Sequence, residues 1–295
     1  MRDILVIMKN RYTFLLIGLV VCISVPAQTI HWIIFADTQS YDIGDEVKNS
    51  VNVLTTQFID RINDAIAPKG YYSPTPKVYR GSDFTESNCN RVIQNMRCGN
   101  KDIIVFYYLG HGGRAEMNST VEDEAYKNSH PWPDLQFDHN GGSQKEFLSL
   151  SNIHRRLKQK EARLTLTIGM CCNNASSKYK KHGVSSQSRK YKLVGKKFAK
   201  KIGQRLFLKY KGDIMVASAK PGQESQGGTY NGRDVDSFTS ALCSTLDKYA
   251  NSDTGDNVTW SSFLSEVATQ CNRNAKAYNN KAQTPKILNH TVLSK

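Results

Sequence analysis

A histidine and two cysteines stand directly after two apolar runs of this sequence. His111 lies between two glycines at the end of one run, and Cys171 and Cys172 follow another run 60 and 61 positions later. A thiol must lose its proton before it attacks a carbonyl carbon, and a nearby imidazole can take that proton and return it to the leaving amine. The backbone N–H of Gly112 could approach a developing oxyanion closely, because glycine has no side chain. These residue types indicate a cysteine nucleophile with a histidine base.

The two apolar runs must be neighbouring strands if these groups are to meet. Near-continuous apolar runs predict buried strands at 31–36, 102–109, 164–168 and 213–219, and helical spacing predicts helices at 51–67, 148–158, 196–210, 237–249 and 260–278. Buried strands separated by helices imply an α/β fold, with a mostly parallel sheet covered by helices on both faces. Such folds gather their functional groups at the carboxyl ends of the strands. We therefore expect the histidine and the cysteines at one edge of the sheet.

The composition is that of a globular protein. The 295 residues are 39% hydrophobic and 22% charged, with 20 glycines, 8 prolines and no internal repeat. These proportions exclude a disordered or fibrous chain. Residues 28–295 suffice for one domain with a sizeable core.

Residues 1–27 have the pattern of a secretory signal peptide. Basic residues precede an apolar stretch at 13–25, and Ala27 is a small residue suited to cleavage before Gln28. The alternative is an uncleaved membrane anchor, but the stretch is shorter than the roughly 20 residues that a spanning helix requires. We expect cleavage near Gln28 and a secreted or cell-envelope protein, in the periplasm or outside the cell.

Six cysteines follow this segment, namely Cys89, Cys98, Cys171, Cys172, Cys243 and Cys271. In an exported protein the first two or the last two could form a disulfide, although spacing alone does not decide connectivity. A bridge between the adjacent middle pair would require a strained ring. We expect at least one of that pair to be a free thiol.

Several segments resemble those of metacaspases, in the same order along the chain. "YYLGHGGR" at 107–114 resembles the histidine motif, and "TIGMCCNNAS" at 167–176 resembles the cysteine motif, in which a strand leads to an acidic residue, a small residue and the nucleophile. Further likenesses are "FLSLSNIHRRL", "DIMVASAKPGQES", "SFTSAL" and "QTPKI". The resemblance spans most of residues 31–287. It implies a caspase-like three-layer fold and a secreted bacterial endopeptidase that uses cysteine and histidine.

The resemblance leaves two candidates for the nucleophile. If Met170 stands where metacaspases carry the acidic residue, the nucleophile is Cys172, whereas counting from the last aliphatic residue of the strand gives Cys171. We favour Cys172, because Gly169 extends the strand by one residue and a polar residue then follows the thiol, as in the family. With either thiol, the backbone N–H groups of the chosen cysteine and of Gly112 would bind the oxyanion.

Met170 is the clearest departure from the metacaspase pattern. The acidic residue at this place helps metacaspases to bind a basic P1 side chain, so its loss puts specificity for Arg or Lys in question. Ser218, near the end of the predicted strand at 213–219, is together with Met170 a candidate substrate-binding residue. Four acidic residues in the loop after the histidine could replace the lost charge: Glu122, Asp123, Asp134 and Asp138. The sequence assigns none of them to the pocket.

The net charge of +14 comes largely from residues 178–211, which include many Lys and Arg residues and no acid. A solvated helix face with a flexible loop explains this pattern without any function. A basic surface could instead hold nucleic acid or an anionic envelope surface by salt-dependent attraction. A second functional interpretation is a processing loop at about 178–201 that the enzyme cuts itself. We favour it over the binding surface, because the segment follows the nucleophile directly.

Two functions therefore compete. The first is a secreted cysteine endopeptidase of the caspase or metacaspase type, acting on proteins or peptides. The second is a catalytically silent caspase-like binding module with a basic surface, in which Met170 marks a decayed site. We expect no cofactor and no metal site, and calcium dependence is implied by the resemblance only, since the sequence shows no acidic loop with ligand spacing. The sequence does not indicate the oligomeric state.

Overall fold

The computed structural model describes residues 28–114, 129–138, 147–174, 196–250 and 257–294. A mostly parallel sheet forms its centre, with the strand order β12-β9-β8-β4-β1-β2. The four central strands are parallel to one another: β1 (Gln28–Ala36), β4 (Ile103–Leu109), β8 (Leu164–Met170) and β9 (Tyr210–Ala217). At the edges, β2 (Tyr71–Tyr72) and β3 (Lys77–Tyr79) run parallel to β1, and β12 (Lys286–Asn289) and β13 (Val292–Leu293) run antiparallel to β9.

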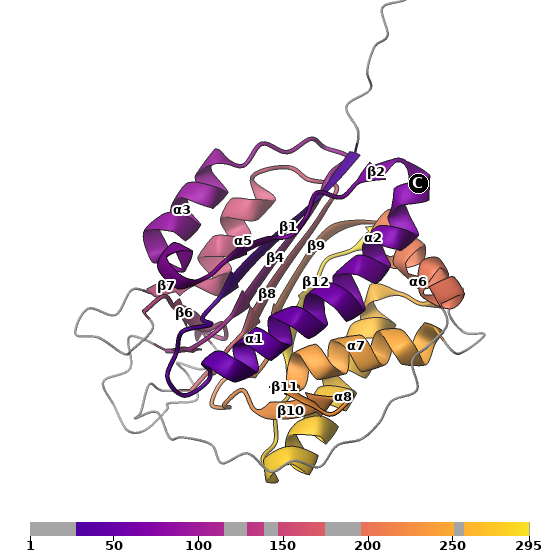
Figure 1. The fold of residues 1–295 in the computed structure, drawn as a ribbon. Coiled ribbons are helices and arrows are strands. Elements are labelled where there is room, and N and C mark those ends of the chain that lie inside the picture. Colours follow the sequence, from indigo (N-terminus) through magenta and orange to yellow (C-terminus); the bar gives the residue numbers. More distant parts are fainter. Residues whose placement is uncertain (1–27, 115–128, 139–146, 175–195, 251–256, 295) are drawn as a thin grey trace, which may run out of the picture.

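Helices cover both faces of this sheet (Figure 1). One face is covered by α1 (Gly44–Val53), a π-helical turn (Leu54–Ile59), α2 (Asp60–Ile66), α6 (Lys196–Leu208), α7 (Ser237–Ala250) and α8 (Trp260–Asn279). The other face is covered by α3 (Glu86–Asn95) and α5 (Leu150–Lys158). Short 3-10 helices lie at Ala67–Lys69 and Gly81–Asp83. The result is a three-layer α/β fold.

Strand β4 shows how the sequence fills both layers. All seven of its residues are buried. Val105 and Tyr107 belong to the core beneath α1 and α7, whereas Phe106 and Tyr108 belong to the core beneath α3 and α5. Because strand side chains alternate between faces, a run that is apolar at every position is stable only between two apolar layers. Each such side chain contributes about 1.5–3 kcal/mol by its burial, which holds the strand in register.

Two small antiparallel sheets lie at the carboxyl edge of the central sheet. The first contains β5 (Gly112–Gly113), β6 (Asp134–Gln136) and β7 (Phe147–Ser149). The second is a hairpin of β10 (Gly227–Tyr230) and β11 (Arg233–Asp236). These sheets place polar loops beside the ends of β4, β8 and β9.

The predicted elements are confirmed, with shifted ends. All four predicted strands and all five predicted helices are present. The largest shift is at the first helix, which we predicted at 51–67 and which begins at Gly44, because polar residues of α1 conceal its apolar stripe. Helix α3 and the short strands were not predicted from the sequence.

The structure describes the six cysteines but not the proposed leader. All six cysteines after residue 27 are free, so neither of the two disulfides that we considered forms. The proposed signal peptide at 1–27 lies outside the described residues. Among the described residues, no helix combines the length and the apolar character needed to cross a membrane.

Candidate active site

Strands β4 and β8 bring the histidine and the cysteines to one edge of the sheet. The two strands pair in parallel register up to Leu109 opposite Met170. Just beyond, the N–H of Gly110 donates to the carbonyl oxygen of Met170 (3.2 Å). His111 and Cys171 therefore leave the sheet from neighbouring positions, as the strand pattern predicted.

The imidazole of His111 is oriented by the loop after β1. Its Nε2 lies 2.9 Å from Oδ1 of Asp42 and 3.1 Å from Oγ of Ser40, and the Ser40 hydroxyl donates to the same Asp42 oxygen (2.6 Å). The hydrogen bond from His111 holds the pKa of Asp42 well below its usual range, against the effect of burial. An ionised carboxylate at Nε2 favours a proton on that nitrogen, so Nδ1 becomes the basic nitrogen of the ring.

Gly112 begins strand β5 and directs its N–H toward the cysteine segment. The N–H of Gln136 donates to the carbonyl oxygen of His111 (3.0 Å), so these two residues form a hydrogen-bonded pair and the N–H of Gly112 points away from β6. Arg114 lies two residues on, where the N–H points the same way, and it donates to the carbonyl oxygen of Asn174 (3.1 Å). The N–H of Gly112 therefore faces the segment just after β8.

Position 112 also has no room for a side chain. A Cβ there would lie 2.6 Å from Sγ of Cys171 and 2.8 Å from the carbonyl oxygen of Asp134. Neither neighbour can withdraw, because the thiol is buried and the carbonyl belongs to β6. Only glycine lets the two loops approach this closely.

The two cysteines differ in burial. Cys171 is 1% exposed and packs in the core beneath α3 and α5. Burial raises its pKa well above the usual value, and the charges of Cys172 and Asp134 add to this effect. Cys172 is only half-buried. Of the two thiols, Cys172 is the one that a substrate could reach.

Asn173 fixes the chain directly after the thiols. Its fully buried side chain donates from Nδ2 to the carbonyl oxygens of Pro131 and Ala219, both at 3.1 Å. Its Oδ1 accepts from Nε of Arg114 (3.4 Å), and its backbone N–H donates to the carbonyl oxygen of Gln223 (2.9 Å). These bonds tie the cysteine segment to the loops after β5 and β9, which holds the preceding thiol in place.

Carboxylates lie near Cys172. Burial raises the pKa of the Cys172 thiol to about 11, and the backbone N–H of Ser225 opposes this effect. The charges of Glu224 and Glu46 raise the pKa further, whereas Lys281 lowers it. Lys281 also forms an ion pair with Glu224, with 2.7 Å between Nζ and Oε2. The thiol is therefore protonated at neutral pH, in acidic surroundings.

Glu46 stands on α1 among other acids. Burial raises the pKa of its carboxyl group to about 8, and the charges of Asp236, Asp234 and Asp42 add to this effect. Glu46 has no ion-pair partner among the described residues. A Cβ at Gly227 would lie 3.0 Å from its Oε2, so the carboxyl group contacts the start of β10. A cation placed here would relieve the repulsion between these carboxylates.

The sequence matches a known protein family over most of its length. The caspase domain matches residues 53–295, which include the histidine and both cysteines. The chain belongs to the caspase domain family. Caspase domains are cysteine peptidases, and the three-layer α/β fold described above is the caspase-like fold. A solved structure similar to this chain is caspase-1 from Spodoptera frugiperda, with 14% identity, 88% of each chain covered and a TM-score of 0.48. No curated protein matches the sequence significantly.

Met170 and Ser218 of this caspase domain are buried beside the site. The sulfur of Met170 accepts a hydrogen bond from the Ser225 hydroxyl (3.4 Å). The hydroxyl of Ser218 accepts from the N–H of Cys171 and donates to its carbonyl oxygen, both at 3.2 Å. In this structure both side chains support the loop that carries the thiols. Their predicted role in substrate binding stays a prediction.

The acids whose charges raise the pKa of Cys172, Glu46 and Glu224, are not those that the sequence suggested. Glu122 and Asp123 lie outside the described residues. Asp134 belongs to β6 beside the buried thiol, and Asp138 accepts a hydrogen bond from Gln136. Glu46 and Glu224 take the nearby positions instead, from the loops and helices that follow β1 and β9. The strand-end rule predicts that the loops after these two strands lie at the site, but it does not indicate which of their residues reach the thiol.

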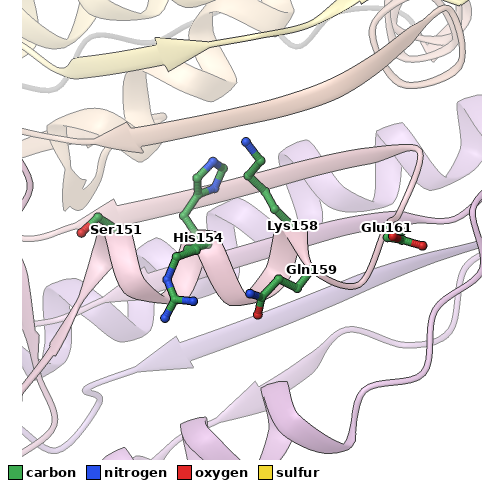
Figure 2. Close-up of a pocket in the computed structure, with 6 residues that line it drawn as sticks. Ser151, His154, Lys158, Gln159 and Glu161 are labelled. Carbon is green, nitrogen blue, oxygen red and sulfur yellow. The ribbon is translucent and has the colours of Figure 1, made fainter.

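A hollow in the surface of this caspase domain lies over α5 (Figure 2), and its lining residues are Ser151, His154, Arg155, Lys158, Gln159 and Glu161. Nε2 of His154 and Nζ of Lys158 lie 3.0 Å and 2.9 Å from the carboxylate of Asp213, and Nδ1 of His154 lies 2.8 Å from the hydroxyl of Thr167. These contacts fasten α5 to β8 and β9. None of the lining residues belongs to the strand ends that carry His111 and the thiols.

Proposed function

We propose that this caspase domain is a cysteine endopeptidase of the metacaspase type, with Cys172 as nucleophile and His111 as base. The observation that carries the proposal is the contact of Nε2 of His111 with Asp42 (2.9 Å) at the strand edge where Cys172 is the more accessible thiol. One ring nitrogen is held by a carboxylate, and the other then serves the thiol.

The proposed reaction begins from a protonated thiol, because the pKa of Cys172 is raised to about 11. Nδ1 of His111 takes the proton as the sulfur attacks the carbonyl carbon of the peptide. The N–H groups of Gly112 and Cys172 donate to the oxyanion. The imidazolium, stabilised by Asp42, returns the proton to the leaving amine. Water then hydrolyses the acyl-enzyme, with His111 again as base.

We further propose that this enzyme cleaves after Arg or Lys, with Glu46 and Glu224 in place of the acid that is lost at Met170. The support is the position of both carboxylates near Cys172 and the raised pKa of Glu46, about 8, among other acids. With a pKa of about 8, Glu46 is largely protonated at neutral pH in the free protein, and a basic P1 side chain would favour its ionised form and pair with it. By the same interaction it would lower the pKa of Cys172, so the correct substrate would help to activate the nucleophile.

Substitution of each thiol tests the nucleophile. Cys172→Ala should abolish peptide cleavage, since loss of a nucleophile removes several orders of magnitude of rate. Cys171→Ala should keep most of the activity, and circular dichroism should show both variants folded. The reverse pattern would assign the role to Cys171. If both variants and the unaltered protein are equally inert, the silent binding module is the correct function.

A peptide library tests the specificity. The unaltered protein should cut after Arg and Lys, and Glu46→Gln should lower kcat/KM for these peptides about tenfold, which corresponds to about 1.4 kcal/mol of lost ion pairing. Asp45→Asn is the matched control, because its exposed side chain is the next one along α1. Cleavage beside neutral residues, unaffected by Glu46→Gln, would contradict basic specificity.

We propose that residues 1–27 direct export and are removed, and that the enzyme cuts itself at about 178–201, a segment whose residues 178–195 lie outside the described residues. Mass spectrometry of the secreted protein beside its Cys171→Ala, Cys172→Ala double variant tests both cuts. An intact leader would contradict export, and an uncut chain that still cleaves peptides would contradict self-processing.

Protein or peptide substrates are the proposed partners, and the chemistry uses no cofactor. Calcium dependence has support only from the metacaspase resemblance, so the peptidase assay should give the same rate with calcium and with a chelator. Binding of nucleic acid or of an anionic surface by the basic segment is the less favoured alternative. It would appear as salt-dependent retention of the double cysteine variant on DNA or on anionic vesicles.

A further inference from the structure

Three potential metal ligands meet at the edge of the sheet opposite to the thiols. His31 stands near the start of β1, and Asp102 directly precedes β4, which lies beside β1 in the sheet (Figure 1). Cys98 belongs to the loop between α3 and β4. Because β1 and β4 are parallel, their amino ends bring these side chains together, a full strand length from the catalytic edge.

The ligand atoms are close together. Nε2 of His31, Sγ of Cys98 and a carboxylate oxygen of Asp102 all lie within 4.8 Å of one another. Nε2 of His31 is 3.2 Å from Oδ2 of Asp102, and these side chains are 24% and 14% exposed. Cys98 is also partly buried. The three groups therefore share one partly enclosed place that an ion from solvent can enter.

The backbone holds this cluster in shape. Oδ1 of Asp102 accepts from the N–H of Thr29 (2.9 Å), and Oδ2 accepts from the N–H of Gly99 (2.8 Å). The N–H of Asp102 donates back to the carbonyl oxygen of Gly99 (2.9 Å), which closes the turn that carries Cys98. The pairing of β1 with β4 fixes His31 opposite the same turn. A cation would thus meet ligands that are already positioned, at little cost in conformational entropy.

We propose that His31, Cys98 and Asp102 bind a zinc ion. One nitrogen, one sulfur and one oxygen are the donor types that zinc accepts in proteins, with water as a fourth ligand. A thiolate and a carboxylate together balance the charge of the divalent ion, and binding releases the thiol proton to solvent. The donor set does not suit calcium, which takes six to eight oxygen ligands. An ion pair would account for the contact between His31 and Asp102, but it would not account for the thiol of Cys98 beside them.

Cobalt binding tests the site, because a cobalt ion bound to a cysteine thiolate shows a sulfur-to-metal charge-transfer band. The full chain with Cys171→Ala and Cys172→Ala is the reference protein, so that the catalytic thiols contribute nothing. This protein should bind one Co²⁺ with the band, and Zn²⁺ should displace the cobalt. A reference protein without the band would overturn the proposal.

Single substitutions in the reference protein identify the ligands. Cys98→Ser should remove the band, and His31→Gln should weaken cobalt binding at least tenfold. Cys89→Ser is the matched control, because this buried cysteine of α3 lies outside the cluster, and it should keep the band. Retention of the band in Cys98→Ser, or unchanged affinity in His31→Gln, would overturn the assignment. If circular dichroism shows that one variant is unfolded, the other decides.

A stability measurement gives a second readout. A ligand that binds only the folded state raises the melting temperature. Zinc in excess should therefore raise the melting temperature of the reference protein by several degrees, and it should leave Cys98→Ser unchanged. An equal rise in both proteins would place zinc elsewhere and overturn the proposal.

Discussion

Replacing Glu46 by glutamine should make the stability of this protein less dependent on pH. Burial raises the pKa of Glu46 from 4.5 to about 8 in the folded protein, and the charges of Asp236, Asp234 and Asp42 add to this effect. The folded state therefore keeps a proton that the unfolded state releases. The stability that depends on this carboxyl group is fully present below pH 4.5, falls as the pH rises to about 8, and is constant above that value.

The magnitude follows from the two pKa values. One pKa unit corresponds to about 1.4 kcal/mol, so a change from 4.5 to about 8 corresponds to at most roughly 5 kcal/mol of unfolding free energy. Glu46 is half-buried, and water screens part of the interaction. We therefore expect a loss of about 3 kcal/mol in the unaltered protein, and none in Glu46→Gln, whose side chain has nearly the same shape and no charge.

Urea unfolding at a series of pH values measures this loss. The free energy of unfolding of Glu46→Gln, relative to the unaltered protein, should increase by about 3 kcal/mol between about pH 5 and about pH 9. Asp45→Asn serves as control for the loss of a neighbouring acid on α1, because its side chain is 95% exposed. A parallel curve for Glu46→Gln would refute the acidic environment that we assign to this residue.

Four further predictions concern the site itself. Asp42→Asn should lower kcat by about 10–100-fold with little change in KM, because an amide does not hold the proton on Nε2 of the histidine. Peptide hydrolysis measures kcat, and an unchanged value would remove Asp42 from the mechanism. Gly112→Ala should lower the melting temperature and abolish cleavage, since its Cβ meets the buried thiol; normal activity would contradict the close approach. Asn173→Ala should cost about 2–4 kcal/mol in urea unfolding, because two buried carbonyl oxygens lose their donor; a loss below about 1 kcal/mol would show that water replaces the amide. Alkylation of Cys172 by iodoacetamide, followed by mass spectrometry, should accelerate about tenfold per pH unit from neutral pH upward; a rate independent of pH would contradict a protonated thiol.

The sequence predicted the central sheet and the long helices because their signals are local. A fully apolar run such as 103–109 has few alternatives to a buried strand, and residues 260–279 repeat their apolar positions over five turns. Helix α3 was missed because its residues are mostly polar, and its clearest signal is the N-cap, Thr85, whose side chain accepts from the N–H of Asn88. The short strands of the two small sheets contain two to four residues, too few for a period to be visible.

Half of the candidate site could be predicted for the same reason. His111 and the two cysteines directly follow strands, so their meeting depends only on the register of β4 with β8. Asp42 and Glu46 reach the site through the path of the loop and helix after β1, and the sequence pattern does not encode the direction of that path. The choice between the two thiols depends on the environment of each, and burial distinguishes them where spacing alone left both open.

The protonated state of Cys172 has a consequence for inhibitors. With a pKa of about 11, only about one thiol in ten thousand is ionised at neutral pH, so simple electrophiles and oxidants should react with it slowly. An electrophile that also carries a guanidinium group would bring a positive charge to Glu46 and Glu224 and would favour the thiolate that it needs. Selective covalent inhibitors of this protein should therefore gain from the cation twice, once in affinity and once in the rate of bond formation.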